Sequence, residues 1–418
     1  MGKFILEGSV VKGFQPGTLE NAGMMVFIPD GITEIGPEAF AHCDLTGVFM
    51  PDSVTVIHER AFYCCGLLKR AVLSKNTKYI KAEAFKYCMS LQECDLPEGL
   101  KEIGEDAFFG CWNLEEAIIP DSAESLGDGV YCGCVKLRKI RLPENLKVLP
   151  KHFLGGCGLT EIELPASLQR IGEGALECID TLVKLRIPDG VSLIGNGAFS
   201  NMRHLEEAVL PKELRILGKN TFEGCVSLKR VELPDRLIKI PEHTFRSCKC
   251  MEKIYIPASV QKIGEEAFAY CEKLSGLVFS EGITEIGDYA FCRCEALREA
   301  KLPNSLQRIG EAAFFGCTSL HTVNIPEGVT MIETETFRFC KNLHSVRIPA
   351  NVQSVKAFAF GECREMQHLQ FDSLPEDLSA FSFIGCAPMT INGTFVNSEA
   401  RVLSELRKLY QKDTGMNR

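Results

Sequence analysis

The stretch Leu96-Pro97-Glu98-Gly99-Leu100-Lys101-Glu102-Ile103-Gly104-Glu105-Asp106-Ala107-Phe108-Phe109-Gly110-Cys111-Trp112-Asn113-Leu114-Glu115-Glu116-Ala117-Ile118 is one complete copy of a 23-residue unit, and the next copy starts at Ile119-Pro120. Counted from Leu96 as position 1, apolar residues fall at positions 1, 5, 8, 12, 13, 16, 19 and 22, and position 2 is Pro. A fixed period of this length is typical of a solenoid, in which each repeat packs only on its neighbours. The sequence therefore predicts one stacked array rather than two or three globular domains.

Sixteen copies of this unit follow one another between residues 28 and 392. They start at Ile28, Met50, Leu73, Leu96, Ile119, Leu142, Leu164, Ile187, Leu210, Leu233, Ile256, Phe279, Leu302, Ile325, Ile348 and Phe371. Residues 1–27 are out of phase, and their short apolar runs predict a hairpin that caps the first repeat, since an open solenoid end exposes apolar edges. In the C-terminal segment 393–418, apolar residues recur at helical spacing within 398–412, which predicts an amphipathic helix that covers the last repeat or docks a partner.

Within each unit the pattern predicts an α/β solenoid. Positions 20 to 1 alternate between polar and apolar residues, as in Arg138-Lys139-Ile140-Arg141-Leu142, which is the period of a half-buried strand. Pro at position 2 ends this strand, because it cannot donate a hydrogen bond to a neighbouring strand. Positions 5–8 predict a second short extended segment, and sequences such as Gly104-Glu105-Asp106-Ala107-Phe108 at positions 9–13 predict one helical turn.

Fourteen of the twenty cysteines stand at position 16 of the unit. They are Cys43, Cys65, Cys88, Cys111, Cys134, Cys157, Cys225, Cys248, Cys271, Cys294, Cys317, Cys340, Cys363 and Cys386. One residue type at one phase of a stack predicts a buried ladder of reduced thiols, in which each Cys acts as a small hydrophobe with a weak donor. Neighbouring strands lie about 4.8 Å apart, whereas a disulfide needs Cβ atoms about 3.8 Å apart. Reduced thiols are typical of a reducing compartment.

The composition limits the classes of protein to which this chain can belong. Apolar residues make up 45% and charged residues 24% of the chain, as in a folded globular protein, and the formal net charge of -9 argues against a nucleic-acid partner. No apolar run approaches the roughly 20 residues that a membrane-spanning helix needs. The apolar run at the N-terminus, within Met1-Gly2-Lys3-Phe4-Ile5-Leu6-Glu7, is too short for a signal peptide. As the sequence stands it predicts a cytoplasmic protein, and a cell-surface or secreted one if a signal peptide has been removed.

The pattern Ala-Phe-x-x-Cys-x-x-Leu, seen in Ala267-Phe268-Ala269-Tyr270-Cys271 through Leu274 to Leu277, resembles the BspA-like family of leucine-rich repeats. The resemblance extends over all sixteen repeats. It implies a right-handed superhelix with a parallel β-sheet on its concave side, and short strands and helical turns on its convex side. It also implies binding of proteins or glycans, often at bacterial cell surfaces, without enzymatic activity in the repeats.

Positions 20, 21 and 23 of the strand are expected to point outward from the concave sheet. In the central repeats their charges alternate, as in Glu206, Lys229 and Glu252, which predicts mutual neutralisation. In the last repeats only Glu299 is acidic, so this surface is expected to be polar, mildly basic and without ion pairs. The candidate binding residues on the outward positions are Tyr255, Arg298, Lys301, His321, Asn324, His344, Arg347, His368 and Gln370.

Other constellations have simpler explanations than a site. His321, His344 and His368, expected on adjacent strands, raise the alternatives of a transition-metal site or a pH-sensitive anion site, but most metal sites have a tighter motif. Acidic residues recur at position 10, as in Glu265 and Asp288. A favourable interaction with the dipole of a helical turn explains them better than a calcium-binding site does. Zinc is not expected at three Cys-x-Cys pairs, since each contains a ladder cysteine: Cys132 and Cys134, Cys248 and Cys250, and Cys292 and Cys294.

The sequence contains no phosphate-binding loop, nucleophile elbow or zinc-protease motif, so it predicts no enzyme, metal or cofactor. The first hypothesis is a non-enzymatic scaffold that binds a protein or peptide on the concave face, with an anionic partner suited to Arg298, Lys301 and Arg347. The alternative is a bacterial cell-surface adhesin that binds a host protein or a glycan. Its expected aromatic platforms are scarce, because the outward positions offer only Phe49 and Tyr255.

Overall fold

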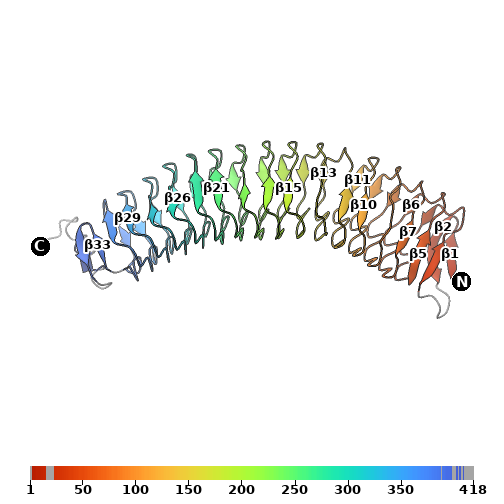
Figure 1. Cartoon of the computed structure of the whole chain (residues 1–418), viewed down its shortest axis with the longest axis horizontal. Helices are drawn as coiled ribbons and strands as arrows, with labels where there is room; N and C mark the ends of the chain where they lie inside the picture. The colour runs from red at the N-terminus through yellow and green to blue at the C-terminus, as the bar shows by residue number, and fades with distance from the viewer. Residues whose placement is uncertain are drawn as a thin grey trace. The chain divides into compact units, whose positions relative to one another are not determined.

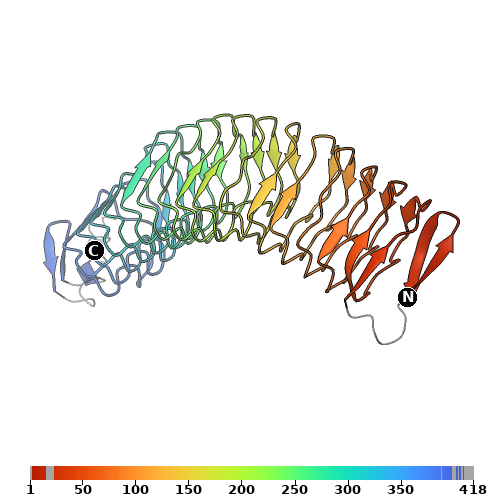
Figure 2. The same cartoon turned by 45° about the vertical axis from the view of Figure 1, so that its right-hand side comes forward.

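The computed structural model describes residues 2–15, 23–386, 388–397, 402, 404, 405 and 408. The chain forms two units, Met1–Leu205 and Glu206–Arg418. In both units the chain winds through successive repeats that stack as a β-solenoid (Figures 1 and 2). Each repeat contributes a two-residue strand at positions 7–8 and, in most repeats, a second strand near positions 21–23. We call the outward sides of these two sets of strands the long-strand face and the short-strand face.

The strands of unit 1 belong to two sets. The long-strand set is β3 (Met24–Phe27), β5 (Leu45–Phe49), β7 (Arg70–Val72), β10 (Glu116–Ile118), β12 (Lys139–Arg141) and β15 (Lys184–Arg186). The short-strand set is β1 (Lys3–Glu7), β2 (Val10–Gln15), β4 (Glu34–Ile35), β6 (Val56–Ile57), β8 (Tyr79–Ile80), β9 (Glu102–Ile103), β11 (Ser125–Leu126), β13 (Val148–Leu149), β14 (Arg170–Ile171) and β16 (Leu193–Ile194). Apart from the antiparallel hairpin β1–β2, the paired strands are parallel, as in β4–β6 and β10–β12.

Unit 2 repeats this arrangement. Its long-strand set is β17 (Glu207–Val209), β19 (Arg230–Val231), β21 (Lys253–Ile256), β23 (Gly276–Phe279), β25 (Glu299–Ala300), β27 (Thr322–Val323), β29 (Ser345–Ile348), β31 (His368–Phe371), β33 (Met389–Ile391) and β34 (Thr394–Val396). Its short-strand set is β18 (Ile216–Leu217), β20 (Lys239–Ile240), β22 (Lys262–Ile263), β24 (Glu285–Ile286), β26 (Arg308–Ile309), β28 (Met331–Ile332), β30 (Ser354–Val355) and β32 (Asp377–Leu378). Strands β25, β27, β29, β31 and β33 form one parallel sheet, which the antiparallel strand β34 ends. The predicted parallel sheet is therefore confirmed, while the handedness and curvature of the superhelix stay predictions.

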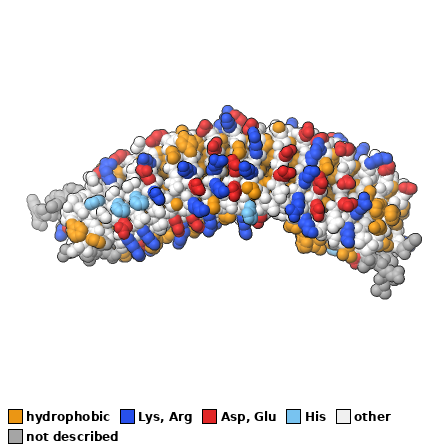
Figure 3. All heavy atoms as spheres, viewed as in Figure 1, with side chains coloured by type: hydrophobic (Ala, Val, Ile, Leu, Met, Phe, Trp, Pro, Cys, Tyr) orange, Lys and Arg blue, Asp and Glu red, His pale blue; other side chains and the backbone are white. Residues whose placement is uncertain are grey.

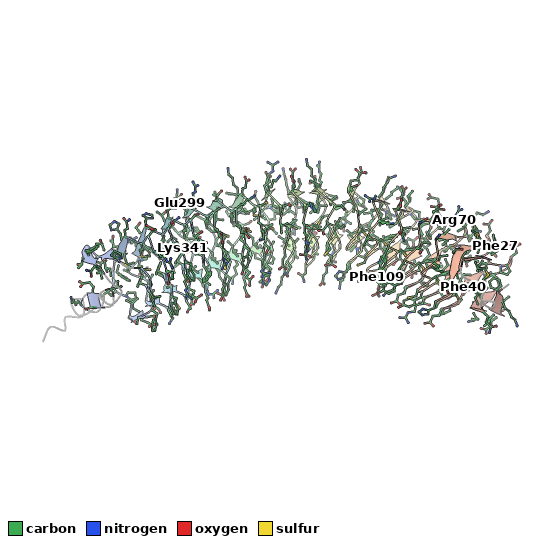
Figure 4. The ribbon with its side chains drawn as sticks, turned by 60° about the horizontal axis from the view of Figure 1, so that its bottom comes forward. Phe27, Phe40, Arg70, Phe109, Glu299 and Lys341 are labelled. Carbon is green, nitrogen blue, oxygen red and sulfur yellow. The ribbon has the colours of Figure 1, made fainter. Side chains whose placement is uncertain are left out.

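A column of stacked aromatic rings fills the core of each unit. In unit 2, Phe291 lies between Phe268 and Phe314, with ring centroids 5.2 and 5.3 Å away and nearly parallel planes. Phe40, labelled in Figure 4, stacks in the same way on Phe62 in unit 1 at 5.0 Å. These rings are fully buried at position 13 of their repeats. The regular apolar period thus becomes a continuous column of contacts between repeats.

The cysteine ladder is buried as predicted, and each of its fourteen members is a free thiol shielded from solvent. Its hydrogen bonds could not be read from the sequence. The Sγ of Cys294 donates to the carbonyl oxygen of Phe268 in the preceding repeat at 3.2 Å, and the backbone N–H of Cys271 donates to the same oxygen at 3.2 Å. Each such carbonyl therefore satisfies two donors, and the cysteine side chain fills the space beside the aromatic column without leaving a buried polar group unpaired.

The predicted helical turn at positions 9–13 is wrong. In the repeat that starts at Ile256, Glu266 and Tyr270 have φ angles of 48° and 62°, in the left-handed region, so a right-handed helix cannot continue through them. The N–H groups of Glu266, Phe268 and Tyr270 donate to the next repeat, whereas those of the residues between them donate within their own repeat. Because alternate N–H groups bind the neighbouring repeat, the segment is a run of turns rather than an α-helix, and the fold is a β-solenoid rather than an α/β one.

The N-terminal segment forms a hairpin, and the C-terminal segment is described only in part. Residues 2–15 form the hairpin β1–β2, and β3 then begins the long-strand face. Most of the helix expected over 398–412 lies outside the described residues, but Val402, Ser404, Glu405 and Lys408 are helical, and Val402 is buried. No helix in the described part of the chain is long and apolar enough to cross a membrane.

Candidate functional site

The predicted binding residues of the last repeats lie on β25, β27, β29 and β31 or immediately before or after these strands. The parallel register sets Ser345 of β29 beside His368 of β31, and Arg347 beside Gln370. His368 in turn lies beside Thr390 of β33. The side chains of Arg298, Lys301, His321, Asn324, Arg347, His368 and Gln370 are exposed, and that of His344 is half-buried. Figure 3 shows histidine side chains near the C-terminal end of unit 2.

Tyr255 lies apart from this group, on β21. Its side chain is 55% exposed, its hydroxyl oxygen accepts a hydrogen bond from the Ser280 hydroxyl at 2.8 Å, and its register partner on β23 is Val278, which is also exposed. The structure therefore brings Tyr255 together with an apolar neighbour rather than with the polar residues of the last repeats.

Two of the cations expected to be free are paired. Lys301 lies 3.3 Å from Glu299, and Arg347 bridges Asp372 and Glu327, the latter at 3.3 Å. The Asp372 carboxylate raises the pKa of Arg347 above its usual value by accepting its hydrogen bonds. The prediction of a surface without ion pairs was wrong for two reasons: Glu299 is close enough to pair with Lys301, and Asp372, the partner of Arg347, stands at position 2, where most repeats have Pro. Within the described residues, Arg298 makes no ion pair and is the remaining free cation of the predicted group.

The alternating charges of the central repeats form some of the predicted pairs. Lys229 lies 2.8 Å from Glu206 in unit 2, and Lys139 lies 2.9 Å from Glu116 in unit 1. These pairs are largely exposed, so each contributes no more than about 1 kcal/mol. Their effect is to leave the central long-strand face electrically balanced, which makes it a poor surface for steering a charged partner.

The histidine pair does not form a metal site as it stands. The rings of His321 and His344 stack in parallel with centroids 5.8 Å apart, and Nδ1 of His344 donates to the carbonyl oxygen of Asn342 at 2.6 Å. Stacked rings present their faces to each other, so their nitrogen lone pairs do not converge on one ion. In the described part of the chain no three His, Cys, Asp or Glu side chains are grouped to hold a metal.

The side chain of Asn324 is hydrogen-bonded to the backbone of Leu302. Its Oδ1 accepts a hydrogen bond from the N–H of Leu302 at 2.9 Å, and its Nδ2 donates to the carbonyl oxygen of the same residue at 2.9 Å. Asn392 holds Phe371 in the same way, at 2.8 and 3.3 Å. An amide side chain thus replaces a strand partner at both places, and Asn324 has little capacity left for a ligand.

An open groove of about 620 Å³ lies at the C-terminal end of this face, across β29, β31 and β33. Its polar lining is Ser345, Arg347, His368, Gln370, Thr390 and Asn392, with Gly393 at the turn before β34. Three of the predicted residues therefore meet in one hollow. The sequence interpretation missed Thr390 and Asn392 because the last repeat is one residue short, although the alternation of Met389-Thr390-Ile391 marks a strand.

A second hollow, of about 520 Å³, lies on the short-strand face of unit 1 between β11 and β13, which belong to different sheets. At position 9, Gly127 donates its N–H to the carbonyl oxygen of Ile103 at 2.8 Å. Pro150 occupies the same position in the next repeat and has no N–H to donate. The missing N–H donor coincides with the break between the two sheets, and Pro150 was not singled out from the sequence.

The chain is similar to known repeat proteins over most of its length. The family model for the BspA type leucine rich repeat region matches residues 24–138, 101–225, 170–298 and 261–390. A leucine-rich repeat protein from Bacteroides ovatus has 28% sequence identity, with a TM-score of 0.77 over 84% of this chain and 93% of that chain. One from Eubacterium ventriosum has 23% identity and a TM-score of 0.51 over 75% of this chain and 82% of that chain, which shows the fold alone. None of the curated proteins matches significantly.

The overlapping matches span residues 24–390 with a model built from repeats of this type. The stacked parallel strands, the buried cysteine at a fixed phase and the aromatic column agree with that assignment. The chain belongs to the BspA-type leucine-rich repeat family.

Proposed function

We propose that this chain is a non-enzymatic scaffold that binds a polypeptide segment on the long-strand face of its last repeats. The observation that carries the proposal is the groove across β29, β31 and β33, which is open, has both polar and apolar groups in its lining, and lies in the same sheet as β25 and β27. Side chains held on three neighbouring parallel strands keep fixed spacings, so they form a preorganised surface for an extended partner.

The lining favours a segment with its own hydrogen-bonding groups. Ser345 and Thr390 hydroxyls and the Gln370 amide both donate and accept hydrogen bonds, as peptide groups do. Because Arg347 already carries two carboxylate partners, only Arg298 favours an anionic segment, and a mixed polar segment fits as well as an acidic one.

The same geometry speaks against catalysis. Ser345 and Thr390 are the hydroxyl groups of the groove, and within the described residues neither is hydrogen-bonded to a histidine, so no nucleophile and base are paired there. The groove is also open to water. Fixed dipoles stabilise a transition state most strongly in a site that excludes water and has a low dielectric constant, and this groove does not provide one.

A glycan-binding surface adhesin is the second candidate. Phe395 on β34 is 68% exposed and lies directly opposite Thr390, so an aromatic ring stands beside the neutral hydroxyl and amide groups of the groove. An exposed ring with polar neighbours suits the apolar face and hydroxyl groups of a sugar. This candidate places the protein at a cell surface, whereas the scaffold proposal keeps it in a reducing compartment.

The test is selection from a displayed library of random peptides, followed by titration calorimetry on three forms of the protein. The groove variant carries His368→Ala, Gln370→Ala and Thr390→Ala. The control variant carries Thr330→Ala and Gln353→Ala, two exposed residues of the short-strand face in the same part of unit 2. We expect enriched peptides to bind the native and control proteins equally and the groove variant at least tenfold more weakly.

Two results would decide against the scaffold. If no peptide is enriched, or if enriched peptides bind the groove variant as tightly as the native protein, the long-strand groove is not a peptide site. Binding of an oligosaccharide that is lost in Phe395→Ala, with no peptide enriched, would move the adhesin to first place.

A further inference from the structure

The outermost strand of unit 1 has a free edge. In the described part of the chain β1 pairs only with β2 and stands first in its sheet (Figures 1 and 2). Its other edge therefore presents N–H and C=O groups that no described strand pairs. Ile5 and Leu6 on this strand are 45% and 48% exposed. A free strand edge with exposed apolar side chains is a template for another strand.

The edge is also regular enough to pair. The hairpin has one register shift, where Ile5 lies opposite Gly13 and Leu6 lies opposite Val11, so the extra residue is Lys12 of β2. A bulge kinks the strand that contains it. Because the bulge is in β2, β1 keeps the alternation of an ordinary strand along its outer edge.

The sequence of β1, Lys3-Phe4-Ile5-Leu6-Glu7, is complementary to itself when reversed. We propose that β1 of one copy pairs in antiparallel fashion with β1 of a second copy, around a two-fold axis at Ile5. Lys3 of each copy then lies opposite Glu7 of the other, Phe4 opposite Leu6, and Ile5 opposite Ile5. Every register pair is either oppositely charged or apolar, as an isologous interface requires.

The pairing also accounts for the exposed groups at this end. It covers Ile5 and Leu6, and it supplies partners to the outer N–H and C=O groups. Glu7 has one competing contact, an ion pair with Lys12 at 3.2 Å, but both side chains are largely exposed, so this pair is weak. A second copy thus offers Glu7 a partner without disturbing the hairpin.

Sedimentation velocity over a range of concentrations tests this interface with three variants. Lys3→Glu places two carboxylates opposite each other twice in the dimer, and Glu7→Lys does the same with two ammonium groups. We expect each variant alone to dimerise at least about tenfold more weakly than the native chain, which corresponds to about 1.4 kcal/mol. An equal mixture of the two variants restores both opposite-charge pairs and should dimerise as the native chain does.

Lys12→Gln is the matched control, since it removes the neighbouring lysine and the competing ion pair but leaves β1 unchanged; it should dimerise at least as well as the native chain. All these residues are exposed, so folding is not at risk. A native chain that stays monomeric at every concentration would overturn the proposal. So would a dimer unaffected by Lys3→Glu and Glu7→Lys, or open-ended assembly in place of a dimer.

Discussion

Phe291→Ala is expected to lower the free energy of unfolding of unit 2 by about 3–5 kcal/mol. The ring is fully buried, lies between Phe268 and Phe314 in the aromatic column, and meets Phe279 edge-on at 5.9 Å. Removing it leaves a cavity that the neighbouring repeats cannot close, because their backbones are held at fixed spacing by hydrogen bonds on both sides. The loss therefore includes both the apolar transfer energy and the cavity.

The measurement is chemical denaturation followed by circular dichroism, with hydrogen exchange of the amides of residues 245–337 to locate the weakened repeats. Phe395→Ala is the control, since that ring is 68% exposed and its loss should change the stability by about 0.5 kcal/mol or less. Equal effects of the two substitutions would show that the aromatic column does not stabilise the stack.

Gly127→Ala is expected to destabilise unit 1 by about 1–3 kcal/mol. A Cβ atom on Gly127 would lie 2.3 Å from the backbone nitrogen of Glu105 and 2.5 Å from the carbonyl carbon of Gly104, in the preceding repeat. Backbone atoms of a hydrogen-bonded repeat cannot move aside as a flexible side chain does. The methyl group would have to separate the two repeats and weaken the hydrogen bond from the Gly127 N–H to Ile103.

Gly99→Ala is the matched control, because nothing lies within 4 Å of the Cβ position of Gly99. It should be neutral, or stabilise slightly by restricting the unfolded chain. The fluorescence of Trp112, the one tryptophan of the chain, reports unfolding in this region. A Gly127→Ala protein as stable as the Gly99→Ala protein would mean that the repeats are less closely packed than described.

The period of the sequence was sufficient to predict the stack, its parallel strands and the burial of its cysteines, because a residue type at one phase implies one environment. The period was not sufficient to predict the backbone conformation of the segments between the strands. Glu266 and Tyr270 are ordinary residues whose left-handed φ angles arise from hydrogen bonds to the next repeat, and no local propensity encodes that. This is why a helical turn was expected and a run of turns is observed.

The candidate site was predicted in part for a related reason. Alternation placed Arg347, His368 and Gln370 on one face, and they do line one groove. Their partners depend on departures from the repeat: Asp372 replaces Pro at position 2, and Thr390 belongs to a shortened last repeat. Positions that depart from the period distinguish one repeat from the others. Such positions therefore help to identify a binding site in a repeat protein.

The measurement that tests the described stack most directly is peptide-resolved alkylation of the cysteines in the folded and the unfolded chain. Burial raises the pKa of Cys271 to about 12 and that of Cys294 and Cys317 well above the usual range, so these thiols are both shielded and protonated near neutral pH. Cys178 is exposed and serves as the internal standard. We predict that Cys178 reacts in the folded protein, whereas the ladder cysteines react only after unfolding. Ladder cysteines that react in the folded chain as fast as Cys178 would contradict the buried ladder and the packing of repeats built on it.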